Sequence, residues 1–442
     1  MHYMNELQGA VLAAALLAAL PVQAQTPAGS EEAWNLHAQS TYIWQKKASF
    51  AAPYSGINSL STAAETSYSF SATAALGWRA WSGGELYVNP ELVQGVPLSN
   101  LTGLGGMSNG EQQKTGGPHP TLYRARLFAR HSIALGGARV QVESDSNQLA
   151  GMVDQRRIVV TAGNLALIDI FDNNALAHDP RTQFMNWALL AHGAYDFAAD
   201  ARGYSNGAAV EWYWDAWVLR AGRFMQPAQS NGLALDRQLR HHFGDQLEVS
   251  HSHAIAGRAG SVRLLAFHNQ AVMGSFKDAL AAAARDGGSP DVALVRHQQS
   301  KRGAGISVDQ EVTAAIGVFA RASANDGATE TYAFAEIDRS LSAGAVFKGE
   351  LWQRSADTAG VALVRDGLSG AHRAYLAAGG HGAFVGDGRL AYRPEAIAET
   401  YYSVALGGHA WLTFDYQHIA NPAYNRARGP VNVGAIRLHA QM

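Results

Sequence analysis

Apolar and polar residues alternate with a period of two along most of the chain from Trp34 onward. In the segment SFSATAALGW, residues 69–78, one face would carry Phe70, Ala72, Ala74, Leu76 and Trp78. AVEWYWDAW at 209–217 and VNVGAIRLHAQM at 431–442 show the same pattern. Because successive side chains of a strand point to opposite faces, this alternation predicts strands with one apolar and one polar face.

The predicted strands follow one another as hairpins. About 14 to 18 runs of roughly 8 to 11 residues are present, the length a tilted strand needs to cross a membrane. Turns are expected near residues 311–314 and at Gly407-Gly408, residues 329–352 form a further predicted strand pair, and residues 93–120 contain a long polar loop. Aromatic residues near strand ends are expected at the two membrane interfaces: Trp44, Trp78, Trp81, Trp212, Trp214, Trp411 and Tyr416.

Composition supports a membrane barrel over a soluble β protein. Only 16% of residues are charged, whereas 46 are glycine and 9% are aromatic. A formal net charge of −2 shows no basic excess for nucleic acid. The absence of cysteine excludes disulfides and thiolate metal sites. A soluble β-sandwich or solenoid remains the alternative, and it would normally carry more surface charge.

The first 24 residues have the pattern of a signal peptide. An apolar stretch from Ala10 to Leu20 is too short to span a membrane and ends at Pro21. Val22 and Ala24 stand at the two positions that a signal peptidase reads. We therefore expect a signal peptide over residues 1–24 and a barrel over residues 25–442. No apolar run of 18 or more residues follows, which argues against membrane helices.

Three arginines fall in one predicted strand, LYRARLFARHSIAL at 122–135. Strand alternation would place Leu122, Arg124, Arg126, Phe128 and Arg130 on one face, with the aliphatic and aromatic residues between them on the other. In a barrel wide enough to hold water, the inner face is polar and the outer face apolar. The pattern therefore predicts that Arg124 and Arg126 point into a water-filled lumen.

Residues 163–197 contain too many polar groups for a lipid-facing strand. They include Asp169, Asp172, Asn173, Asn174, Asp179, Arg181, Gln183 and Asn186. We predict a loop that folds into the lumen and narrows it. A calcium site and a loop closed only by its own Asx turns are the alternatives, although the spacing lacks the glycine and terminal glutamate of an EF-hand.

Carbohydrate recognition would use the same residue types. Sugar hydroxyls bind planar bidentate partners, and the apolar face of the ring packs on an aromatic side chain. Arginines and the polar loop would supply the first, and Trp187, Trp212 or Trp214 the second. Attraction of anions without sugar contact is the alternative for the arginines, and a place in the interface belt is the alternative for each tryptophan.

Other motifs carry less chemistry. Two GxSxG matches, at Ser108 and Ser205, lie in a glycine-rich loop and before a strand, not in a strand–turn–helix elbow. The histidines 241, 242, 251 and 253 would need further ligands to bind a metal. GSFKDALAAAARDGG predicts a helix after Ser275 that ends at Gly287.

Several long motifs resemble the carbohydrate-selective outer-membrane porin family of the OprB type. They are DNNALAHDPRTQFMNWALL, LRAGRFMQPAQSNGLALD, TETYAFAEIDRSLSAG, AHRAYLAAGGHGAFVGDGRLAY and LTFDYQHIANPAYNRARGPVNV. The resemblance extends from about Trp34 to the C-terminus. The resemblance implies a 16-stranded antiparallel barrel with inward constriction loops. It also implies passive, selective diffusion of sugars such as glucose.

Together, these patterns predict a saccharide-selective porin of a Gram-negative outer membrane, with no enzyme activity, metal or cofactor. The expected constriction residues are Arg124, Arg126, Asp172, Asn173, Asn174, Asp179, Arg181 and Glu211. Expected partners are the saccharide, outer-membrane lipid and the barrel-assembly machinery, and an oligomer is possible. The alternatives are a general or anion-selective porin, an outer-membrane enzyme such as a barrel lipase, and a secreted lectin.

Overall fold

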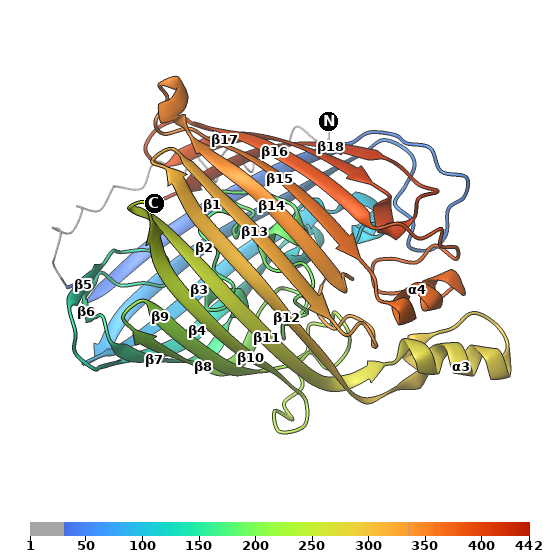
Figure 1. Cartoon of the computed structure of the whole chain (residues 1–442), viewed down its shortest axis with the longest axis horizontal. Helices are drawn as coiled ribbons and strands as arrows, with labels where there is room; N and C mark the ends of the chain where they lie inside the picture. The colour runs from blue at the N-terminus through green and yellow to red at the C-terminus, as the bar shows by residue number, and fades with distance from the viewer. Residues whose placement is uncertain (1–30, 335) are drawn as a thin grey trace.

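Sixteen antiparallel strands close into one barrel, as predicted (Figure 1). The computed structural model describes residues 31–334 and 336–442, so the predicted signal peptide lies outside the described residues. Each strand pairs with its neighbours along the chain, and β1 closes the ring by pairing with β18. The barrel strands are β1 (Trp34–Lys47), β2 (Glu65–Trp81), β3 (Gly84–Val96), β4 (Gly117–Ala134), β7 (Arg157–Leu165), β8 (Ser205–Trp214), β9 (Trp217–Met225), β10 (Phe243–Ile255), β11 (Arg258–Gly274), β12 (Arg296–Thr313), β13 (Ile316–Asn325), β14 (Arg339–Lys348), β15 (Thr358–Gly367), β16 (Glu395–Ala405), β17 (Ala410–Ala420) and β18 (Val431–Gln441).

Long and short connections lie at opposite ends of the barrel. Helices α3 (Phe276–Asp286) and α4 (Gly370–Ala377) belong to loops at one end, and the small hairpin β5 (Arg139–Val142) and β6 (Gly151–Asp154) lies at the other (Figure 1). We call these the long-loop end and the short-turn end. The remaining helical turns are α2 (Trp187–Leu190) and the 3₁₀ turns Leu98–Leu101, Gln112–Lys114, Leu167–Asp169, Val292–Val295, Gly349–Trp352 and Pro422–Tyr424. None of the helices in the described part of the chain is long and apolar enough to cross a membrane.

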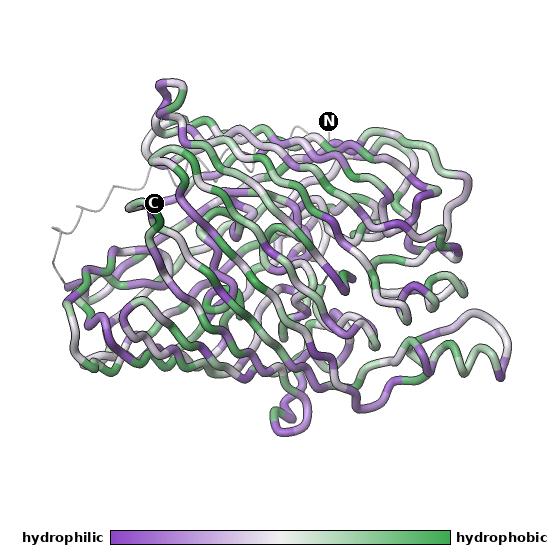
Figure 2. The backbone as a smooth tube through the Cα atoms, viewed as in Figure 1, coloured by the Kyte–Doolittle hydropathy of each residue, from purple (hydrophilic) through white to green (hydrophobic). Residues whose placement is uncertain are grey.

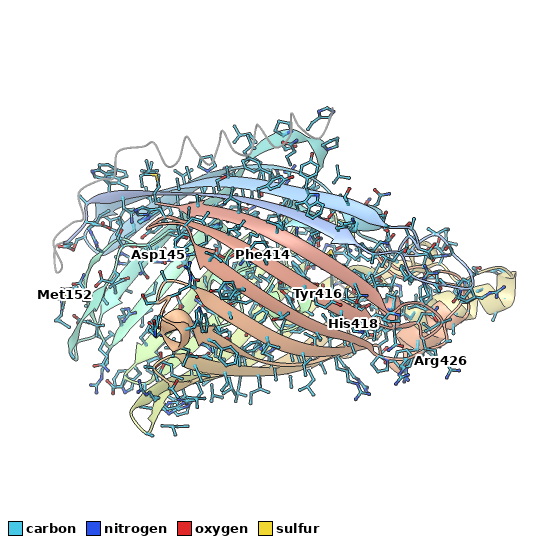
Figure 3. The ribbon with its side chains drawn as sticks, turned by 90° about the horizontal axis from the view of Figure 1, so that it is seen from above. Asp145, Met152, Phe414, Tyr416, His418 and Arg426 are labelled. Carbon is cyan, nitrogen blue, oxygen red and sulfur yellow. The ribbon has the colours of Figure 1, made fainter. Side chains whose placement is uncertain are left out.

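The two faces of the barrel wall differ in polarity, and hydropathy alternates along the strands (Figure 2). On β17, Phe414 and Tyr416 are exposed on the outer face (Figure 3). Alternating with them along the strand, Thr413, Asp415 and Gln417 are buried. Large apolar side chains stay exposed around the outside: Trp34, Leu36, Leu76, Trp78, Trp212, Trp214, Leu247, Leu264, Leu341 and Leu363 are examples. The main buried apolar cluster is formed largely by loop residues packed against the inside of the wall.

A β-bulge corrects the predicted face of the arginines on β4. Asn89 pairs with Arg126 and the next residue, Pro90, pairs with Arg124, so Ala125 is the extra residue of β4. A bulge shifts the alternation by one position. Arg126 consequently points into the lumen, whereas Arg124 lies on the exposed side with Leu122. The prediction that Arg124 and Arg126 share one face was wrong.

Three further local predictions are settled by the structure. The turn at Gly407-Gly408 and the helix capped by Ser275 are confirmed, since the Ser275 hydroxyl accepts a hydrogen bond from the Asp278 amide. Residues 329–352 do not form a strand pair, because β14 begins only at Arg339. The preceding segment is a loop whose Tyr332 and Ala333 amides donate to Asp196, so its alternating pattern reflects packing inside the barrel.

Candidate functional site: the constriction of the barrel

The loop between β7 and β8, residues 166–204, lies inside the barrel and is held by strands around its circumference. The amides of Met185 and Asn186 donate to Glu399 on β16. Arg437 on β18 donates to the carbonyl of Pro180 over 2.8 Å. Other bonds join the loop to β3, β10, β12 and β13. The prediction of an inward loop is confirmed, and we call this segment the constriction loop.

Asp172 is the innermost anchor of the constriction loop. Its carboxylate is fully buried, faces Arg321 of β13 at 3.3 Å and accepts the amide of His192 at 2.6 Å. Burial raises the pKa of Asp172, but the charge of Arg321, the nearby imidazoles of His192 and His178 and the hydrogen bond from the His192 amide together hold the pKa below its ordinary value. Arg321 also donates to the carbonyls of Leu189 and Ala177. Asp172 therefore fixes the shape of the loop.

Arg181 bridges two neighbouring carboxylates inside the barrel. Its guanidinium donates to Glu91 on β3 at 2.7 Å and to Glu111 at 2.9 Å. Lys114 adds a second positive charge, 3.2 Å from Glu111. Burial raises the pKa of Glu111, but the charges of Arg181 and Lys114 outweigh it and keep the pKa lowered. The bridge ties the tip of the constriction loop to the wall and to the loop before β4.

Arg126 forms the second charged pair of the constriction. Its Nε and Nη2 atoms donate to the two oxygens of Asp169 at 2.7 and 2.6 Å, a bidentate geometry. Burial raises the pKa of Asp169, but the charge and hydrogen bonds of Arg126, together with His178 and the Ala166 amide, hold the pKa below its ordinary value. The Arg126 guanidinium also lies 5.3 Å from the centre of the Tyr204 ring. This cation–π contact places an aromatic hydroxyl beside the paired charges.

A cavity of about 900 Å³ runs past these groups. Carboxylates and basic side chains line it in nearly equal numbers. The acidic residues are Glu111, Asp145, Asp169 and Asp179, and the basic residues are Lys114, Arg126, Arg181, Arg202 and Arg437. Most of these charges are already paired or hydrogen-bonded. A passing solute therefore meets donors and acceptors in fixed positions and no strong field of one sign.

Aromatic side chains lie beside the polar groups. Trp187 of α2 and Trp411 of β17 line the cavity, together with Phe197, Tyr204, Phe334 and Tyr401. Trp212 and Trp214 point outward, are each 44% exposed and contact each other edge to face. They therefore cannot stack on a solute in the lumen, and Trp411, predicted for the interface belt, lies inside. Of the three tryptophans predicted to contact the sugar ring, only Trp187 lines the cavity.

The structure brings only some of the predicted site residues together. Arg126, Asp179 and Arg181 line the cavity, whereas Asp172, Asn173, Asn174, Arg124 and Glu211 do not. Asn174 donates to Ser307 on β12 and accepts the Leu176 amide, so it closes a turn against the wall. Glu211 pairs with Arg220 at 2.9 Å on the neighbouring strand. Asn173 is exposed outside this cavity.

Five residues of the site were not predicted from the sequence: Glu91, Glu111, Lys114, Tyr123 and Tyr204. Glu91 is completely buried, yet it accepts hydrogen bonds from Tyr123, Tyr204 and Thr73 in addition to Arg181. The sequence feature that could have indicated Glu91 is a single glutamate within an alternating strand. The other residues lie in loops or in the part of β4 that precedes the bulge. At these positions, strand alternation does not correctly predict which face a side chain occupies.

Neither of the two other chemistries considered is supported by the geometry. Within residues 31–334 and 336–442, no three histidine, cysteine or acidic side chains are grouped to hold a metal ion. The hydroxyls of Ser108 and Ser205 donate to Gln45 and to the Met225 carbonyl. Neither serine has a histidine partner in the described part of the chain.

The sequence profile of the carbohydrate-selective porin family OprB matches residues 57–442. The chain belongs to this family. No curated protein is similar enough to count as a match. Among solved structures, the high-pH structure of Pseudomonas putida OprB has a TM-score of 0.70 at 16% identity, over 93% of this chain and 94% of that one. Its low-pH structure has a TM-score of 0.49 at 13% identity, over 93% of each chain.

Family and fold agree with the geometry of the lumen. At 16% identity, the likeness to the high-pH structure shows the barrel fold alone. The family match covers most of the chain and makes this protein a sugar-selective channel. The expected porin class is confirmed. The residues that select the sugar are a separate question.

Proposed function

We propose that this OprB-family porin lets neutral saccharides diffuse through the outer membrane of a Gram-negative bacterium, with the constriction loop as the selective element. The observation that carries the proposal is the paired charges of Arg126–Asp169 and Arg181–Glu111 beside Tyr204 and Trp187 along one cavity. The proposed step is passive, without chemistry or a cofactor.

The paired charges suit hydroxyl groups. Each guanidinium has donors that remain free after pairing, and each carboxylate has lone pairs that remain free. A sugar hydroxyl both donates and accepts, so it can contact both members of a pair. Such exposed contacts exchange with water at little net cost, and a channel needs binding strong enough for entrance yet weak enough for exit.

Charge balance favours this proposal over an anion-selective pore. Arg126 and Arg181 face the lumen, and each is already in a salt bridge with a carboxylate. Arg437 is buried and donates to loop carbonyls. An anion would have to displace these carboxylates, whereas a neutral solute would not. The experiment below distinguishes sugar binding in the constriction from unselective diffusion.

The outer surface supports the proposed location and partners. Exposed Trp34, Trp78, Trp81, Trp212, Trp214 and Trp217 cluster toward the short-turn end of neighbouring strands, as an interface belt would. We include outer-membrane lipid as a partner, and the barrel-assembly machinery as the route of insertion. Any oligomer would form through this outer wall.

Single-channel conductance in a planar bilayer tests the proposal. Glucose and a maltose-type sugar are titrated against the folded, detergent-purified protein. Saturable reduction of the ion current by sugar is the expected result. Openings of normal size without any reduction by either sugar would contradict sugar binding and favour the general porin.

A further inference from the structure

The barrel wall has a notch between β4 and β8 at the long-loop end. β4 pairs with β7 only from Leu127 to Ala134, so its first ten residues, 117–126, pair with β3 alone. β7 ends at Leu165, where the chain turns into the lumen, and β8 begins at Ser205. A side-chain hydrogen bond from Asn164 to the Ala125 carbonyl crosses the gap.

An unpaired strand edge is costly in a membrane wall. Backbone amides and carbonyls without partners cannot face hydrocarbon, and closed barrels exist because they remove such edges. Leu122, on the edge of the notch, is 69% exposed, so apolar surface extends alongside it. On the lumenal side, Tyr204 and Arg202 of the constriction loop pack on Tyr123 and cover the notch. On the outer side, a ligand that offers both hydrogen-bonding groups and apolar surface would cover it.

Basic side chains surround the notch. A cavity of about 490 Å³ in it is lined by Arg124, Arg202 and Arg237, against a single carboxylate, Asp200. Asp200 accepts the amides of Arg202 and Tyr204 within its own turn. A neighbouring hollow shares Arg237 and adds Arg223, Arg240 and His241. Arg124, Arg237 and Arg240 have no salt bridge with any residue from 31–334 or 336–442.

Strand register places this basic surface at the edge of the apolar belt. Arg223, Asp245, His268 and Arg302 are direct cross-strand neighbours on β9 to β12. The next outward row toward the short-turn end is Ala221, Leu247, Ala266 and Ala304. The change from an apolar row to a charged row is expected where hydrocarbon meets lipid headgroups. The notch opens beside this boundary.

The long loops of outer-membrane barrels lie on the extracellular side. We propose that the notch binds a phosphorylated lipid of the outer leaflet, whose phosphates lie among Arg124, Arg237 and Arg240. Planar guanidinium groups without carboxylate partners match phosphate oxygens in bidentate geometry. Exposed Leu122 and Leu233, 69% and 54% accessible, would pack on the acyl chains. The lipid would seal the wall where β4 lacks a neighbour. This inference rests on the proposed outer-membrane location.

A second copy of the chain fits the notch less well. Pro118 and Pro120 lie on the free part of β4, and proline cannot donate to an added strand. Two copies meeting through this edge would also bring their arginines together, and like charges repel. Free phosphate would leave the leucines uncovered. The observations therefore favour a lipid over both.

Native mass spectrometry of the detergent-purified full chain tests the proposal, with diphosphoryl lipid A as the probe. The test variant is Arg124→Gln/Arg237→Gln/Arg240→Gln, and Arg258→Gln is the matched control, an exposed arginine at the short-turn end. Fully dephosphorylated lipid A and glucosamine phosphate separate the lipid from its headgroup chemistry. Heat-modifiable gel mobility reports folding, and the single variant Arg237→Gln serves if the triple variant does not fold.

We expect wild type and Arg258→Gln to retain lipid A, and the triple variant to bind it at least about tenfold more weakly. Equal retention by the triple variant, equal retention of the dephosphorylated lipid, or a dimer in place of the lipid adduct would each overturn the inference. Stronger binding of glucosamine phosphate than of lipid A would assign a soluble phosphate site instead. Glucose block, measured on the same preparations, reports on the proposed function independently.

Discussion

Arg124 and Arg126 are two positions apart on β4, yet their side chains lie on opposite faces of the strand. The bulge at Ala125 separates them. Arg126 pairs with Asp169 in the lumen, and Arg124 lines the notch in the wall. These two neighbouring arginines therefore form a matched pair for mutagenesis, because only Arg126 belongs to the constriction.

The first prediction compares these two arginines. Arg126→Ala removes the bidentate partner of Asp169 and one side of the proposed sugar contact, so we expect the apparent affinity of glucose block to fall by about tenfold or more. Arg124→Ala should leave the block unchanged. Sugar titration of the ion current measures both. Equal effects of the two variants would remove Arg126 from the mechanism.

The second prediction concerns the Arg181 bridge. Arg181→Ala leaves Glu91 and Glu111 with Lys114 as the remaining ion-pair partner, so we expect a loss of about 3–5 kcal/mol in the free energy of unfolding. The tip of the constriction loop loses its tie to β3, and ion conductance should rise. Urea unfolding and single-channel recording measure the two effects.

Arg285→Ala is the control for Arg181. It removes an arginine of α3 whose side chain is 70% exposed and which pairs with its neighbour Asp286. Exposed pairs contribute about 0–1 kcal/mol, so neither stability nor conductance should change measurably. If Arg181→Ala resembles Arg285→Ala in both measurements, the bridge does not hold the loop.

Much of the barrel could be predicted because its wall obeys strand alternation. In β2, the face with Phe70, Leu76 and Trp78 is the outer face, as the pattern requires. The bulge at Ala125 could not be predicted, since it depends on the pairing of β4 with Pro90 of β3. One unforeseen residue was enough to move Arg124 out of the lumen.

The constriction could be predicted in kind but not in detail. A polar segment of residues 163–197 cannot face lipid, and this placed the loop inside the barrel. The sequence does not say which polar groups meet the wall, because each partner comes from a distant strand. Asp172 faces Arg321, and Arg181 meets Glu91. The predicted role of Asp172 in contacting sugar stays untested, and its position makes it an anchor.

The third prediction addresses that anchor by a double-mutant cycle. Arg321→Ala leaves the carboxylate of Asp172 buried near His192, without its arginine partner, so we expect about 3–5 kcal/mol of destabilisation. Asp172→Asn in the same background removes the stranded charge and should restore part of the stability. Denaturant unfolding of the four proteins measures the coupling. Additive losses would show that the two side chains do not act as a pair.

The fourth prediction is the pH dependence of sugar block. Burial raises the pKa of Asp169, but the charge and hydrogen bonds of Arg126, with smaller contributions from His178 and the Ala166 amide, leave the pKa lowered. Since the folded pKa lies below the ordinary value of about 3.9, the pair is fully formed above that value and is lost as pH falls through the folded pKa. Glucose block by wild type should therefore stay constant from neutral pH down to about pH 4.5 and decline only in stronger acid.

Asp169→Asn separates this titration from others in the lumen. The variant keeps a hydrogen-bonding side chain beside Arg126 but has no carboxylate to protonate, so it should show weaker block at neutral pH and a smaller decline in acid. Glu111 has a lowered pKa for the same kind of reason, with Arg181 and Lys114 as its partners, and its titration remains in the variant. A wild-type midpoint near pH 6, or an unchanged acid profile in Asp169→Asn, would mean that another group controls the block.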